Sequence, residues 1–166
     1  MTRNLHALAI NSLLNGPPIN VLIGYQDDTR KKSLIKNIID LSVTLDRQLV
    51  YIDTFSNFLQ LKDKPLNLVV VSPFEMTLDQ FFSRIICSPK EAIIIVDSYP
   101  SIVNVFFGDE ERADRLFLYF LSRIKHLSHL IIFVRMAPNK GPPTFPIFNK
   151  RFYDKFLYHK DLNHVL

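Results

Sequence analysis

A strand-to-helix junction near residue 24 carries the side chains with most potential for chemistry. The apolar run Ile19–Ile23 leads into Gly24, and a helical pattern begins near Thr29, so the loop between them has the position of a phosphate-binding P-loop. That motif reads GxxxxGK[ST]. Its glycines let backbone N–H groups surround the phosphates, its lysine pairs with the outer phosphates, and its hydroxyl binds Mg²⁺.

The loop departs from this motif in both possible alignments. Counted from Gly24, the second glycine, the lysine and the hydroxyl become, in that order, Thr29, Arg30 and Lys31. An alignment on Lys32 and Ser33 also fails, because it has no glycine at either glycine position. The chain therefore lacks the backbone geometry that a P-loop needs.

Asp27 and Asp28 add two carboxylates where a triphosphate would bind. Like charges at about 4 Å repel by about 1 kcal/mol in water, and several-fold more in a partly buried site. The two residues also have a simpler explanation, because Asp caps helix N-termini and stabilises the positive end of the helix dipole. We expect no nucleotide, no other cofactor and no metal at this loop.

Five apolar runs predict a buried parallel sheet, since strands covered on both faces are apolar at nearly every position. They are Ile19–Ile23, Leu49–Ile52, Leu66–Val71, Ala92–Val96 and Leu130–Val134. Helical patterns alternate with them at Thr29–Leu45, Thr77–Ile86 and Glu110–Leu127. Thr77 and Gln80 form a capping box, and a last short strand is expected at Phe156–His159. The pattern predicts an α/β fold with three layers, a mostly parallel sheet flanked by helices.

Length and composition fit one domain of 166 residues. We divide it into an N-terminal segment (1–18), a core (19–135) and a basic loop with the C-terminal tail (136–166). No apolar run approaches the roughly 20 residues that span a bilayer, so no membrane partner is expected. The single cysteine, Cys87, allows no internal disulfide, which fits a reducing compartment, and we expect its thiol to be buried or half-buried.

Two strand ends carry a likeness to a known family. Val50–Phe58 resembles the segment of RecA-type recombinases and their eukaryotic paralogues that reads roughly YIDTEGTF. Ala92–Ser98 resembles their Walker B strand, an apolar run followed by Asp and Ser. Arg112–Leu127 and His129–Arg135 are similar to the helix and strand that follow. The resemblance covers about two thirds of the chain and implies a RecA-like core with Asp97 as the Walker B acid.

The chain also departs from that family at a catalytic position. The Glu that orients the attacking water is replaced by Phe55, which cannot handle a proton or position water. Asp97 is kept, although we favour the simpler interpretation, a carboxylate that ends a buried strand and caps the next turn. The two losses, one in the loop after Gly24 and one at Phe55, point to a pseudo-ATPase without catalytic residues.

The resemblance implies a non-catalytic subunit of a homologous-recombination mediator complex, similar to the small divergent paralogues of Shu-type complexes. Such a subunit is nuclear, pairs with another RecA-like paralogue or a SWIM-domain subunit, and assists recombinase filaments on single-stranded or forked DNA. Two alternatives remain. One is a RecA-like accessory subunit of an Elongator-type complex, which touches tRNA, and the other is an active NTPase with an unorthodox loop.

Nucleic-acid-binding residues are expected in two basic groups. In RecA-like folds the loops after the fourth and fifth strands face DNA, here Phe106–Arg112 and Met136–Arg151. The second loop supplies the cations Lys140, Lys150 and Arg151. The first long helix supplies Arg30, Lys31 and Lys32. Cations neutralise phosphates, and aromatics between them can stack on unpaired bases.

Partner-binding residues are expected in two apolar segments. The amphipathic stretch before Gly16 presents Leu5, Leu8 and Leu13, and the loop after the fourth strand presents Phe106 and Phe107. Packing of the N-terminal stretch back on its own core is an equal alternative. Tyr25, near the ligand edge, fills the empty pocket, anchors a partner or belongs to the core, and these interpretations stay open. His129 is interpreted as structural.

Overall fold

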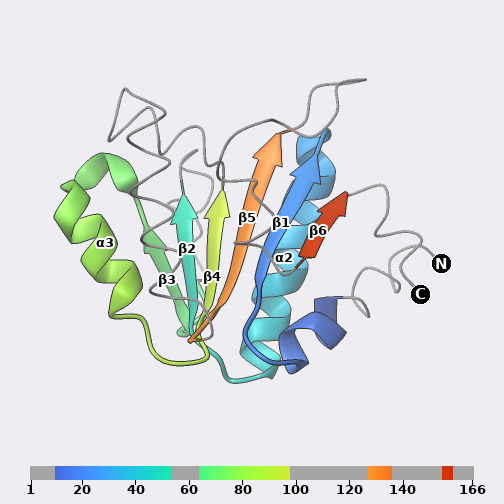
Figure 1. The fold of residues 1–166 in the computed structure, drawn as a ribbon, viewed down its shortest axis with the longest axis horizontal. Helices are drawn as coiled ribbons and strands as arrows, with labels where there is room; N and C mark the ends of the chain where they lie inside the picture. The colour runs from blue at the N-terminus through green and yellow to red at the C-terminus, as the bar shows by residue number, and fades with distance from the viewer. Residues whose placement is uncertain (1–9, 54–63, 98–126, 136–154, 159–166) are drawn as a thin grey trace.

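The computed structural model describes residues 10–53, 64–97, 127–135 and 155–158 (Figure 1). Within them lies a sheet of six strands: β1 (Asn20–Tyr25), β2 (Leu49–Asp53), β3 (Leu68–Val71), β4 (Ile93–Asp97), β5 (His129–Arg135) and β6 (Lys155–Tyr158). Their order is β3-β2-β4-β5-β1-β6, and all five neighbouring pairs are parallel. The predicted α/β class and its parallel sheet flanked by helices are confirmed.

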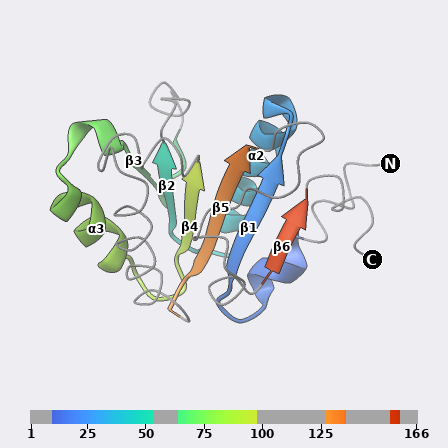
Figure 2. The same cartoon turned by 45° about the horizontal axis from the view of Figure 1, so that its top comes forward.

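Helix α2 (Asp28–Thr44) covers one face of the sheet, and α3 (Leu78–Ile86) lies beside β3 at one edge (Figures 1 and 2). A short 3-10 turn, η1 (Pro73–Glu75), precedes α3 and was not predicted. Residues 10–15 are also helical. No helix among the described ranges is long and apolar enough to cross a membrane.

The strand predictions are correct to within about two residues. β1 runs one residue beyond Gly24, to Tyr25, and β3 begins only at Leu68 because the preceding residues form a turn that leaves Leu66 fully exposed. The last strand is Lys155–Tyr158. The predicted helix Glu110–Leu127 lies outside the described residues except for its final leucine.

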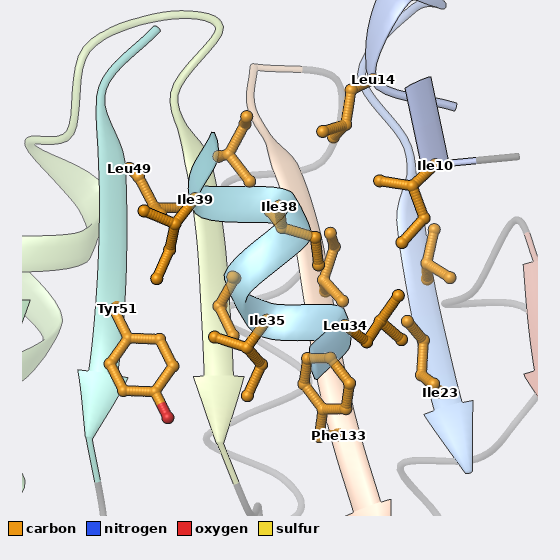
Figure 3. Packing of buried hydrophobic residues seen from close by; sticks show 14 of the residues in the cluster. Ile10, Leu14, Ile23, Leu34, Ile35, Ile38, Ile39, Leu49, Tyr51 and Phe133 are labelled. Atoms are coloured by element: carbon orange, nitrogen blue, oxygen red, sulfur yellow. The ribbon is translucent and has the colours of Figure 1, made fainter. Parts of the chain in front are cut away.

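β1, β2 and β4 are buried at every position, as their continuous apolarity requires, whereas β3 is partly exposed at Val69 and Val70. Side chains alternate along a strand, so odd-numbered residues share one face in β1, β2, β4 and β5. This face packs on α2 through one cluster, in which Leu34, Ile35 and Ile38 of α2 meet Tyr51 and Phe133 of the sheet (Figure 3). Even-numbered residues such as Ile94 and Ile132 are equally buried. The parity of this face decides which polar residues at the strand ends point towards α2.

Helix α2 begins where its sequence signals place it. The side chain of Asp27 accepts a hydrogen bond from the Thr29 backbone N–H at 2.9 Å, and Asp28 lies in the first turn. The structural explanation of these two carboxylates as a cap is therefore confirmed. Buried apolar residues then recur at spacings of one, three and four, which turns one face of the helix to the sheet.

Helix α3 opens with the predicted capping box, in which Thr77 and Gln80 exchange hydrogen bonds through side chain and backbone. Phe81 and Ile85 are its buried residues. Cys87 follows as the C-cap and is exposed, so the expectation of a buried or half-buried thiol is wrong. The cysteine stands at the helix end, past the last residue that faces the sheet.

The described part of the N-terminal segment packs on its own core. Ile10 and Leu14 are buried in the cluster beneath α2, and Leu13 is partly buried against it. Arg47 donates a hydrogen bond from Nη1 to the Leu14 carbonyl at 2.7 Å. For residues 10–15, self-packing is therefore the observed arrangement.

The packing of α2 predicts a contrast between its two faces. Ile38 is fully buried, so Ile38→Ala leaves a cavity and should lower the free energy of unfolding by about 2–5 kcal/mol. Val43 is 51% exposed on the same helix, so Val43→Ala should change it by less than about 0.5 kcal/mol. Urea denaturation with an unchanged m-value measures both. Equal losses in the two variants would contradict this packing.

Candidate functional site

The candidate site lies where β1, β2 and β4 end and α2 begins. Parallel strands bring their carboxyl ends to one edge of the sheet, which is where ligands bind in open α/β folds. Helix α2, which follows β1, covers one face of the sheet, whereas α3, which follows β3, lies beside one edge strand. β2 and β4 are neighbours in the sheet, so their last residues lie side by side. This edge carries the polar residues that end the buried strands.

Asp97, the last residue of β4, is completely buried and has a partner at each carboxylate oxygen. Oδ1 accepts a hydrogen bond from Lys31 Nζ at 2.8 Å. Oδ2 accepts one from the hydroxyl of Tyr51, two residues before the end of β2. A buried carboxylate is tolerated only when such partners replace its hydration, and Lys31 and Tyr51 do so for Asp97.

Lys31, the fourth residue of α2, brings its ammonium into the protein instead of to the surface. The residue is only 2% exposed. Its Nζ lies 4.8 Å from the centroid of the Tyr25 ring, at cation–π distance, and 3.9 Å from Oδ1 of Asp28. Tyr25 in turn packs edge-on against Phe133 at 6.3 Å between ring centroids. Tyr25 is thus a core residue that also contacts the Lys31 ammonium through the face of its ring.

The position of Lys31 in the motif allows the ion pair to be compared with the Mg²⁺ site of a P-loop. Counted from Gly24, Lys31 stands at the position of the Ser or Thr of a P-loop motif, and Asp97 is the residue that the resemblance aligns with the Walker B acid. In P-loop NTPases those two residues hold Mg²⁺ between them. Here the ammonium contacts the carboxylate directly, so the residues present do not fit a bound Mg²⁺.

The phosphate side of the site does not fit a nucleotide either. The connection from β1 to α2 consists of Gln26 and Asp27 alone, because β1 ends at Tyr25 and α2 begins at Asp28. Two residues cannot surround a polyphosphate with backbone N–H groups. The N-terminus of α2 is capped by the carboxylate of Asp27. Gly24, the glycine from which the motif is counted, is part of β1 and not of the connection.

A second buried carboxylate lies next to Asp97. Asp53 ends β2 directly opposite Asp97 in the strand register and is completely buried. The resemblance predicted an Asp at this place, followed by Thr54 and Phe55, which are outside the described residues. Across the described ranges, no group of three or more His, Cys, Asp or Glu side chains could hold a metal ion.

Lys31 is a correction to the predicted nucleic-acid-binding set. Its side chain is buried and paired with Asp97, so it cannot reach a phosphate backbone. The neighbouring Arg30 and Lys32 are exposed, and Arg30 Nε lies 3.7 Å from Oδ2 of Asp27. Ser33 of the degenerate loop is exposed on the same helix.

Several predicted residues lie outside the described parts of the chain. They are Leu5, Leu8, Phe106, Phe107, Lys140, Lys150 and Arg151. Leu13, the remaining predicted partner-binding residue, is half-buried on the molecule's own core.

Tyr51 is the site residue that sequence reasoning missed. The sequence predicts only a core residue at this position, because a Tyr within a buried apolar run is typical of the core. A signal was available, since Tyr51 and Asp53 are two residues apart and so share a face. Its contact with Asp97 depends on β2 and β4 being neighbours, which the run itself does not reveal.

A different polar cluster lies at the opposite edge of the sheet, around His129 at the start of β5. The His129 ring is completely buried, and neither ring nitrogen has a hydrogen-bond partner among the described residues. Burial, and secondarily the positive charge of Arg47, lowers the pKa of His129 to about 4, and the backbone of Gly16 opposes this shift. Arg47 is held by the carbonyls of Glu91 and Leu14. The prediction that His129 is structural fits this position.

The ion pair predicts a strong asymmetry between two adjacent lysines. Lys31→Met leaves the buried Asp97 carboxylate without its cation and should cost about 3–5 kcal/mol of stability. Lys32→Met, at an exposed position, should cost less than about 0.5 kcal/mol. Combining Lys31→Met with Asp97→Leu should cost less than the sum of the single changes, because the pair is removed together. Strict additivity in this denaturation cycle would disprove the pairing.

His129 predicts an acid-sensitive component of stability. Its pKa is lowered in the folded state, so the unfolded chain binds more protons as the pH falls below 6.5. The contribution is fully retained above pH 6.5 and is lost progressively down to about pH 4, by about 3 kcal/mol in all. Urea denaturation at several pH values should show a shallower loss in His129→Phe. Parallel pH profiles for the two proteins would refute this assignment.

Comparison with known proteins leaves the site to be interpreted from its own geometry. The chain matches no model of a known protein family and no curated protein. The direct contact of Lys31 with Asp97 is therefore the main observation on which a function can be proposed.

Proposed function

We propose that this protein is a non-catalytic RecA-like subunit of a homologous-recombination mediator complex. It works in the nucleus, pairs with another RecA-like paralogue or a SWIM-domain subunit, and helps a recombinase filament to assemble on DNA. The observation that carries the non-catalytic part is the ion pair between Lys31 and Asp97, which occupies the acid that an ATPase needs for its metal.

Three independent features support the loss of catalysis. Asp97 is already neutralised by Lys31 and hydrogen-bonded by Tyr51. The connection before α2 is two residues long and has no glycine. Phe55 stands where the resemblance requires a Glu. The alternative of an active NTPase would require catalysis despite all three of these features.

The RecA-like assignment is supported by the ordered likeness together with the parallel sheet. Asp53 and Asp97 end neighbouring parallel strands in direct register, so the two segments that carry the resemblance meet at one edge. Arg30 and Lys32 are exposed on α2 beside that edge, where cations can meet a polyanion. A subunit without nucleotide chemistry contributes through such surfaces and through its partner.

The first test concerns ATP. We expect no ATPase activity and no heat of binding when millimolar Mg-ATP is titrated into the purified protein, because the cation and phosphate positions are filled by side chains. Saturable Mg-ATP binding that disappears in Arg30→Ala or Lys32→Ala would overturn the proposal.

The second test concerns nucleic acid and uses the complex with the partner that co-purifies stably. Changing Lys140, Lys150 and Arg151 together to Ala should weaken binding to single-stranded and forked DNA. The slope of log K against log salt should fall by up to about three contacts. The matched control changes Lys64, Arg84 and Lys90, three exposed cations away from the site, and should leave the slope unchanged.

The outcomes of this titration separate the alternatives. A preference for tRNA over DNA, with the same loss in the triple variant, would favour the Elongator-type reading. Affinity and slope that do not change in the triple variant would leave a scaffolding subunit without nucleic-acid contacts in this loop.

A further inference from the structure

We infer that the ammonium of Lys31 is an internal substitute for a divalent cation, so that the chain keeps the cation position of the fold and fills it with its own side chain. The inference rests on the proposed function and concerns the same site. It assigns Lys31 a definite role, that of the counter-ion holding α2, β2 and β4 together without Mg²⁺.

The geometry of the site carries the first step. A Ser or Thr at position 31 would offer a short hydroxyl and leave room for a metal between α2 and β4. Lysine instead carries its positive charge on a long stem, and its Nζ lies 2.8 Å from Asp97 Oδ1. This is a direct charge-assisted hydrogen bond, with no space for an ion between donor and acceptor.

Burial carries the second step. Asp97 is completely buried, and the Lys31 side chain is 3% exposed, so solvent does not screen this pair. Removing the ammonium would leave the buried Asp97 carboxylate without its charged partner. The ammonium also lies over the ring of Tyr25, with Nζ 4.8 Å from the ring centroid, and an aromatic face favours a cation without supplying an oxygen ligand.

The surroundings retain oxygen atoms that a metal could use if the lysine were removed. Asp97 Oδ1 would lose its donor, and a hydroxyl at position 31 would restore the second protein ligand of a P-loop cation. Mg²⁺ and Mn²⁺ commonly bind through one or two carboxylates and several waters, so one carboxylate and one hydroxyl form an adequate protein contribution.

The experiment is a thermal denaturation of Lys31→Ser with and without millimolar Mn²⁺, in the absence of nucleotide. We expect the variant to be destabilised in EDTA. Mn²⁺ should raise its Tm saturably, by about 5–10 °C at a hundredfold excess over Kd. The wild-type protein should show no change in Tm between EDTA and Mn²⁺, because its cation position is filled.

Two control variants make the readout specific. Lys31→Met removes the same charge but provides a thioether, a poor ligand for Mn²⁺, and should not respond. Lys31→Ser combined with Asp97→Asn keeps the hydroxyl but removes the carboxylate, and should lose the response. Circular dichroism follows the Lys31→Ser variant as a second measurement: a protein that is unfolded in EDTA and folds on addition of Mn²⁺ supports the inference equally.

Three outcomes would overturn the inference: a wild-type Tm that rises with Mn²⁺, a Lys31→Ser protein that does not respond whether folded or unfolded, and an equal response in Lys31→Met. None of these readouts involves ATP or a partner. A negative result in these Tm measurements is therefore distinct from a failure of the proposed function. The latter would be shown by Mg-ATP binding to the wild-type protein.

Discussion

The structure at this edge of the sheet depends on the need to neutralise one buried carboxylate. Asp97 ends a strand in the middle of a six-stranded sheet, faces the interior under α2 and has no exposed surface. Burying an uncompensated charge costs several kcal/mol, so Lys31 and Tyr51 must remain in place. That requirement ties the first turn of α2 to β4 and β2, and it explains why a lysine is found inside the protein.

The same requirement shapes what the site can do. In a working P-loop enzyme the corresponding charge is met by a metal that arrives with the nucleotide, so the state of the site depends on a ligand. Here the counter-ion is covalently part of α2, and the helix N-terminus is capped by Asp27. The charges at this site are paired without any ligand, which agrees with the non-catalytic role that we propose.

Local sequence signals predicted the elements well, for physical reasons that act over short distances. Continuous apolarity located β2 and β4 because burial on both faces leaves no alternation to detect. The Thr77–Gln80 box and Asp27 marked helix starts because capping satisfies backbone N–H groups within one turn. The exposure of Cys87 was missed, since residue type alone does not tell where a helix stops facing its sheet.

The sequence by itself determined that the loop has no phosphate-binding glycines and that the chain builds a parallel α/β sheet, because motif spacing and apolar periodicity are local properties. It did not determine where the Lys31 side chain lies, because the sequence pattern predicts a surface cation there, as it does for Arg30 and Lys32. Only the tertiary structure brought Lys31 to Asp97, 66 residues away, and added Tyr51 from a third element. The partner of a buried charge depends on the order of the strands and on which face of the sheet each side chain points to. The neighbouring residues in the sequence determine neither.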